Sequence, residues 1–78
     1  MAVLRLFAAA REAAGTGRDT VDAETVGDVL LEARRRYGEG FAAVLERCRV
    51  WRNGEPADLD AAVGPDDEVA VLPPVSGG

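Results

Sequence analysis

The stretch Asp67-Glu68-Val69-Ala70-Val71-Leu72-Pro73-Pro74-Val75-Ser76-Gly77-Gly78 ends the sequence, and its first half has the pattern of a strand. Val69 and Val71 alternate with Glu68, so the valines are predicted to face the core and the glutamate marks the outer face. Leu72 is in phase with Glu68 and is therefore expected to be exposed. The two prolines lack backbone donors and fix φ at about −65°, so the strand cannot pass Leu72 and the chain should leave the fold stiff and extended.

Residues 73–78, called the tail below, end in Gly77 and Gly78. Because glycine has no Cβ, the terminal carboxylate is unhindered, and the backbone behind it fits a slot too narrow for side chains. When extended, the tail spans roughly 20 Å. We expect it to be a flexible segment that enters another protein's active site. A frayed, Gly-rich terminus is the alternative, since that is the default for most chain ends.

The remaining residues offer no convincing catalytic or metal-binding group. The sequence has no histidine, its nine basic residues are all arginine, and Cys48 is its single cysteine. Cys48 is therefore interpreted as a small apolar residue. Asp66-Asp67-Glu68 lacks the spacing of a calcium loop and is interpreted as a polar turn. The terminal carboxylate remains, and it needs activation by a partner, typically as an acyl-adenylate made from ATP. We thus expect a non-catalytic protein with no bound cofactor or metal.

Composition narrows the class of protein further. Seventy-eight residues predict one domain, residues 1–78, with a small core. The net charge of −5 argues against nucleic-acid or anionic-membrane partners and favours a partner with a basic face. No apolar run approaches the roughly 20 residues that span a bilayer, and the start lacks a signal-peptide pattern. A cytoplasmic location is expected.

The first half of the chain predicts two strands and a helix. Residues 3–7 form the first strand, with Leu4, Leu6 and Ala8 toward the core and Phe7 exposed on the other face. Residues 8–15 predict a turn with a brief helical segment, and residues 19–23 a second strand antiparallel to the first. Thr25 stands three residues before Asp28, the spacing of an N-cap, and an apolar stripe then continues to a Gly38 C-cap.

The second half predicts a short helical turn and three strands. Residues 39–47 place Phe41 and Leu45 at the core edge, residues 48–52 form a strand, and Asn53-Gly54 predicts a hairpin to a short strand at residues 55–57. Arginines lie on both sides of Val50 and Trp51 in the third strand. The sequence therefore does not decide which of these two side chains points toward the core. The predicted fold is α+β, a mixed sheet with one main helix across one face.

Two motifs resemble a known family. Phe7-Ala8, Arg11-Glu12 and Gly15 after the first strand, together with the ending Asp67–Gly78, are similar to the MoaD/ThiS-like sulfur carriers, most of all to the small subunit of molybdopterin synthase. The resemblance covers nearly the whole chain. It implies a ubiquitin-like β-grasp fold, in which the first and last strands run parallel in mid-sheet. Asp66 departs from the family, which usually has glycine there.

The resemblance also implies a function. Gly78 would be adenylated by an E1-like enzyme, converted to a thiocarboxylate with a sulfur donor such as a cysteine desulfurase or rhodanese, and inserted into the large catalytic subunit, where it supplies sulfur for the molybdopterin dithiolene. Gly77 is expected to be needed for passage. Strand alternation exposes Phe7 and Leu72, and if the first and last strands are neighbours these two residues form one apolar surface beside the tail, on which we expect the partner to dock. The alternative is that Phe7 caps the small core. The resemblance places Arg11 and Pro56 at the rim of this contact, and the expected partner contacts also include Pro73, Pro74, Val75 and Ser76 of the tail. A carrier for thiamine or cysteine synthesis and a ubiquitin-like modifier of target lysines are the alternatives.

Overall fold

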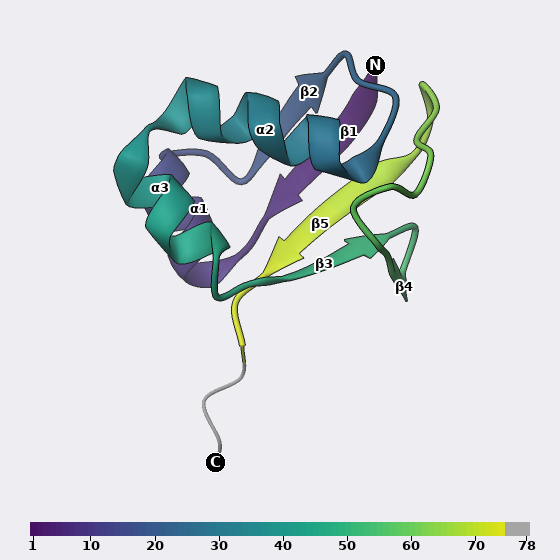
Figure 1. Cartoon of the computed structure of the whole chain (residues 1–78). Coiled ribbons are helices and arrows are strands. Elements are labelled where there is room, and N and C mark those ends of the chain that lie inside the picture. The colour runs from purple at the N-terminus through teal and green to yellow at the C-terminus, as the bar shows by residue number, and fades with distance from the viewer. Residues whose placement is uncertain (75–78) are drawn as a thin grey trace.

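The computed structural model describes residues 1–74, which form a five-stranded mixed sheet and three helices (Figure 1). The strands lie in the order β2-β1-β5-β3-β4. In chain order the elements are β1 (Ala2–Leu6), α1 (Ala8–Ala14), β2 (Arg18–Val21), α2 (Val26–Tyr37), α3 (Glu39–Leu45), β3 (Arg49–Arg52), β4 (Glu55–Pro56) and β5 (Glu68–Leu72). None of the helices within residues 1–74 has both the length and the apolar composition needed to cross a bilayer.

The first and last strands are parallel neighbours at the centre of the sheet, as the resemblance implies. Leu4 pairs with Val69 and Leu6 with Val71, and all four side chains are buried. β1 pairs with β2 and β5 pairs with β3, both antiparallel. The strand alternation that the sequence predicts for β1 and β5 is therefore confirmed, and these two strands provide the centre of the core.

The main helix, α2, lies across one face of the sheet and begins and ends where the sequence predicts. The hydroxyl of Thr25 accepts a hydrogen bond of 3.1 Å from the backbone N–H of Asp28, which satisfies an otherwise unpaired donor of the first turn. Gly38 ends the helix at φ 89°, a region that favours glycine. The predicted apolar stripe is buried at Val26, Val29, Leu30 and Ala33, and half-buried at Tyr37.

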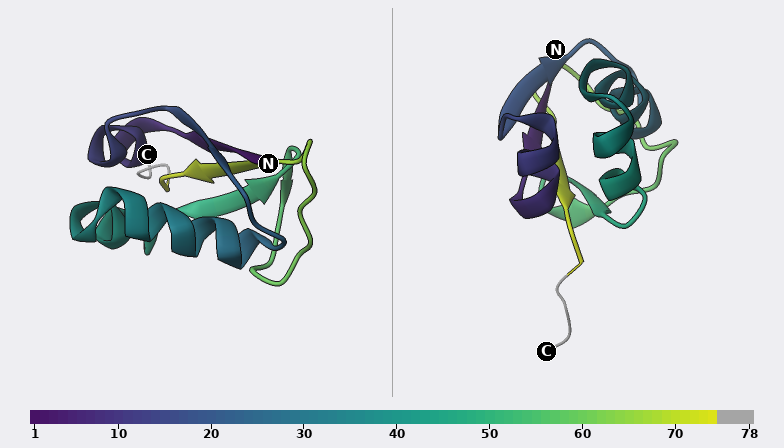
Figure 2. Two further views of the ribbon diagram at one scale, coloured as in Figure 1. Left: turned by 90° about the horizontal axis from the view of Figure 1, so that it is seen from above. Right: turned by 90° about the vertical axis from the view of Figure 1, so that its left-hand side faces the viewer.

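The two short helical segments that the sequence predicts are present as α1 and α3, but two of their side chains are placed differently from the prediction. Ala8, expected in the core, is exposed because it starts α1, and Ala2 and Ala10 are buried instead. β1 and β2 are consequently joined through a helix, although they pair antiparallel as predicted. α3 buries Phe41 completely, well inside the core and not at its edge. α1 and α3 pack against each other at the end of the sheet where β1 and β5 finish (Figures 1 and 2).

The third strand resolves the facing that the sequence left open. Val50 lies opposite Val71 and packs on the core, whereas Trp51 lies opposite Ala70 on the face that the helices leave uncovered. Asn53 and Gly54 both have positive φ, 51° and 83°, which confirms the predicted hairpin turn. The strand after this turn ends at Pro56, one residue earlier than predicted, and β2 ends at Val21, two residues earlier than predicted.

Candidate functional site

The tail leaves the sheet at the end of its central strand. Pro73, half-buried, and Pro74, exposed, follow β5 directly, as the sequence predicts (Figure 1). Two hollows of about 400 Å³ flank these prolines. The one on the helix side is also lined by Ala9, Ala43, Val44 and Arg47, and the other by Arg49, Trp51 and Leu72. Val75, Ser76, Gly77 and Gly78 lie outside the described residues.

Phe7 and Leu72 lie beside this point of departure. The Phe7 side chain is 36% exposed, which confirms that it does not belong to the core, and the Arg5 guanidinium sits over its ring at 5.5 Å from the centroid. Leu72, expected to be exposed, is half-buried, because Arg49 of β3 lies opposite it. The predicted apolar surface next to the tail is therefore present in the folded chain, although Leu72 is less exposed to solvent than expected.

The helix-free side of the sheet, called the open face below, extends this surface. Its residues alternate with the core residues along each strand and are Val3, Arg5, Arg18, Thr20, Arg49, Trp51, Pro56, Glu68, Ala70 and Leu72. Across the strands, Arg5 pairs with Ala70, Ala70 with Trp51, and Trp51 with Pro56. Trp51 was not among the site residues predicted from the sequence, because the arginines on both sides of it hid the phase of β3.

The predicted contact residues are not all neighbours. Phe7, Leu72, Pro73 and Pro74 gather at the tail, and Arg11 is exposed on the adjoining helix α1. Pro56 is exposed on β4, which is an edge strand of the sheet. The strands β3 and β5 lie between β4 and β1. A partner that touches both Phe7 and Pro56 must therefore cover most of the open face.

The side chains singled out as possible reactive groups have structural partners. The Cys48 thiol is half-buried and donates a hydrogen bond of 3.2 Å to the Val44 carbonyl oxygen, and burial raises the pKa of this thiol. Asp67 accepts hydrogen bonds from the Gly64 N–H at 2.7 Å and from Asn53 Nδ2 at 2.9 Å, and these bonds lower its pKa. Within residues 1–74 there is no cluster of three side chains suited to a metal ion.

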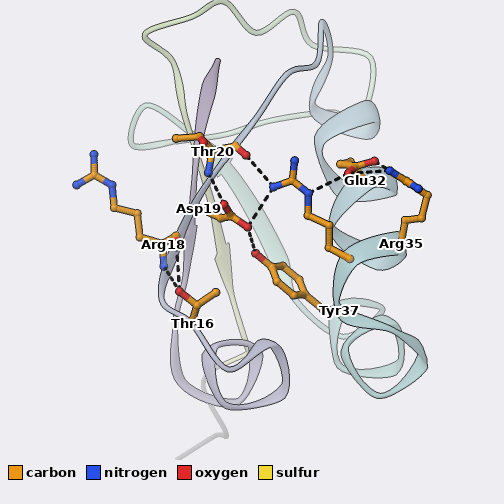
Figure 3. Close-up of polar contacts among 8 residues, drawn as sticks. Thr16, Arg18, Asp19, Thr20, Glu32, Arg35 and Tyr37 are labelled. Atoms are coloured by element: carbon orange, nitrogen blue, oxygen red, sulfur yellow. Dashed lines mark hydrogen bonds and ion pairs between the residues drawn. The ribbon is translucent and has the colours of Figure 1, made fainter.

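A polar cluster joins β2 to α2 on the side of β1 away from β5 (Figure 3). The Tyr37 hydroxyl donates to the Asp19 carboxylate, and Arg36 lies 3.1 Å from the same carboxylate. Burial first, and then the bond to Asp19, raises the pKa of Tyr37 to about 12. The hydrogen bond from Tyr37 is also the largest cause that lowers the pKa of Asp19. These shifted pKa values come from the burial of Tyr37 and from its contact with Asp19, which joins β2 to α2.

The chain is similar to known proteins both in its sequence and in its structure. Residues 4–78 match the ThiS family. Small archaeal modifier protein 1 from Haloferax volcanii is 40% identical over 86 residues, which cover 95% of this chain and 97% of that protein. The solution structure of small archaeal modifier protein 1 from Methanosarcina acetivorans is 31% identical, with a TM-score of 0.87 over 99% of this chain and 95% of that one.

A more distant structure shows the same fold. One chain of the protein–protein complex of subunits 1 and 2 of the molybdopterin-converting factor from Helicobacter pylori 26695 is 22% identical, with a TM-score of 0.75 over 99% of this chain and 97% of that chain. The fold is thus the ubiquitin-like β-grasp. With the family match over nearly its whole length, the chain belongs to the ThiS family and is a ubiquitin-like sulfur carrier of the ThiS/MoaD type.

Proposed function

We propose that the chain is the small, sulfur-donating subunit of molybdopterin synthase and carries its sulfur as a thiocarboxylate on Gly78. The observation that carries this proposal is where the tail begins: Pro73 and Pro74 continue the central strand and leave it beside Phe7 and Leu72. The domain thus offers a docking surface and a carboxylate-bearing arm at the same end of the sheet. In the Helicobacter pylori complex, the protein of similar fold belongs to an assembly of two different subunits.

The chemistry needs three partners and no cofactor held by this chain. In the cytoplasm, an E1-like enzyme joins the Gly78 carboxylate to AMP from ATP and releases pyrophosphate. The terminal sulfur of a persulfide on a sulfur donor, such as a cysteine desulfurase or a rhodanese, then displaces AMP to give an acyl disulfide. A thiol reductant cleaves the S–S bond of this acyl disulfide and leaves the thiocarboxylate. The large catalytic subunit binds the open face and admits residues 75–78, where Gly77 and Gly78 keep the entering backbone narrow.

A second candidate function is supported by the similarity to small archaeal modifier protein 1 at 40% identity. A protein modifier would use the same adenylate of Gly78 but transfer its acyl group to the amino group of a lysine on another protein, which forms an isopeptide bond and releases AMP. The two functions share the activating step and differ in the acceptor. Transfer of sulfur to thiamine or cysteine precursors is a third fate of the same thiocarboxylate.

The mass of the chain recovered from its native cells separates these functions. Exchange of one carboxylate oxygen for sulfur adds about 16 Da, and a variant that lacks Gly78 should show no such species. Copurification of the heavier form with a larger subunit that makes molybdopterin supports the first proposal. A ladder of lysine adducts without any thiocarboxylate would instead establish the modifier function and contradict the first proposal.

A further inference from the structure

Three arginines surround a hollow at the edge of the open face. The hollow has a volume of about 420 Å³ and is called the arginine groove here; its lining residues are Arg5, Arg11, Thr16, Gly17 and Arg18. β1, α1, the loop before β2 and the first residue of β2 each contribute to it. The groove lies next to Phe7, because the Arg5 guanidinium that lines it also sits over the Phe7 ring. It is therefore continuous with the apolar surface at the base of the tail.

The positive charge of this groove is poorly compensated within residues 1–74. Arg5 and Arg18 are direct partners in the antiparallel ladder of β1 and β2, a position at which like charges destabilise a sheet. Arg5 has one acidic neighbour, Glu68, at 3.9 Å between two partly exposed side chains, and such a surface pair contributes little. For Arg11 and Arg18, no carboxylate in the described part of the chain comes within ion-pair distance.

Other arginines of the same protein have close acidic partners. Arg35 and Arg36 both contact Glu32 at 2.9 Å, and Arg36 also reaches Asp19. The whole chain carries a net charge of −5, so acidic residues are not scarce. A poorly compensated group of three arginines on an acidic protein is a local feature, and complementary charge on a partner would reduce the repulsion among these arginines.

The groove is also held in a defined shape. A Cβ at Gly17 would lie 3.2 Å from Arg11 Nε, so the missing side chain leaves the space that the guanidinium of Arg11 occupies. The Thr16 hydroxyl donates a hydrogen bond of 3.0 Å to the Arg18 carbonyl oxygen, which fixes the loop. Part of the entropy cost of arranging these arginines around an anion is therefore already met in the free protein.

We propose that the arginine groove binds a carboxylate-rich segment of the E1-like enzyme that activates the tail. This inference rests on the proposed function, and the activating enzyme is chosen because sulfur transfer and lysine modification both require it. A polyanion such as nucleic acid is disfavoured by the overall charge. The continuity with Phe7 favours an occupant that extends from the groove onto the open face, as a protein segment does and a free anion does not.

The test measures pyrophosphate release by the cell's own E1-like enzyme with Arg18→Glu and Arg11→Glu chains as substrates. Arg34→Glu is the matched control, because it makes the same charge change on an exposed residue of α2. We expect KM to rise about tenfold for the two groove variants with kcat nearly unchanged, and added salt to raise KM more for the wild type than for them. Thermal unfolding checks that each variant is folded, and Arg18→Gln replaces any variant that is not.

The outcomes separate the two proposals. If the wild type releases pyrophosphate but the groove variants have the KM of Arg34→Glu, the groove is not a docking site and the proposed function stands. If the wild-type chain is not adenylated at all, both proposals are overturned. If millimolar inorganic phosphate shifts the NMR signals of Arg11 and Arg18 while KM stays unchanged in the variants, the groove holds small anions and the inference is also overturned.

Discussion

The backbone N–H of Phe7 donates a hydrogen bond of 3.2 Å to the carbonyl oxygen of Val71. This bond joins the end of β1 to β5 just before Leu72 and the two prolines. The exposed aromatic ring and the start of the tail therefore belong to one hydrogen-bonded unit. A partner that contacts Phe7 thereby also fixes the point from which the tail extends toward its active site.

Deletion of Gly78 should leave the fold intact and abolish thiocarboxylate formation, because no core residue is touched while the reactive carboxylate moves. Gly77→Val should fold equally well and still fail to deliver sulfur, because its side chain would obstruct a narrow channel. Mass spectrometry of the activated chain and a molybdopterin synthesis assay measure the two effects. Normal sulfur delivery by either variant would contradict the assigned role of the tail.

Phe7→Ala and Leu72→Ala should each weaken binding to the large subunit by about 1 to 3 kcal/mol, because both residues offer apolar surface beside the tail. Leu31→Ala is the control, since Leu31 is 66% exposed on α2, across the core from the open face. Titration calorimetry gives the affinities, and thermal unfolding should show nearly unchanged melting temperatures. If both variants unfold and the folded fraction keeps full affinity, the docking surface lies elsewhere.

Cys48→Ser should cost about 1 kcal/mol of unfolding free energy and leave sulfur transfer unchanged. The thiol is half-buried next to the Val44 carbonyl oxygen, and its raised pKa disfavours the thiolate that a persulfide or thioester route would need. Denaturant unfolding and the sulfur-transfer assay check the two parts. A folded Cys48→Ser chain that no longer accepts sulfur on Gly78 would show that the cysteine takes part.

Tyr37 should titrate with a pKa of about 12, well above the usual value of about 10. The raised pKa means that the folded state favours the neutral hydroxyl. The stability from this group is therefore complete below about pH 10 and is lost as the pH rises through about 12. Because Tyr37 is the single tyrosine, the ultraviolet absorbance of its phenolate reports it alone.

Asp19→Asn provides the control for that titration. It removes the negative charge beside the hydroxyl, so the pKa of Tyr37 should fall part of the way toward about 10, while the effect of burial remains. A Tyr37 that titrates near pH 10 in the wild type would contradict the contact between β2 and α2.

Local sequence signals predicted most of the fold. The alternation in β1 and β5, the Thr25 cap and the Asn53-Gly54 turn each depend on neighbours in sequence, and each is confirmed. The placement of Ala8 in the core was wrong, because the choice between continuing β1 and starting α1 depends on how α1 packs on α3. Such tertiary contacts decide whether a residue at the end of a helix or strand points toward the core or toward solvent.

The candidate site was only partly predictable for the same reason. The sequence indicates the tail by its motif, and it indicates the exposure of Phe7 by the alternation of side chains along the first strand. Trp51 joined the open face only once its pairing with Ala70 was known. The arginine groove brings together Arg5, Arg11 and Arg18 from three different elements, and no spacing in the sequence indicates that they meet.

The parallel pairing of β1 with β5 has a mechanical consequence. A force between Met1 and Pro74 acts along both strands and strains all bonds of their ladder at once, whereas a force between Cys48 and Pro74 separates β3 from β5 one bond at a time, because Arg49 and Leu72 are paired at that end. Single-molecule pulling should therefore give a clearly larger unfolding force for the first pair, and equal forces would contradict this geometry. An unfoldase that pulls the tail against a held N-terminus would meet the sheet in its most resistant direction.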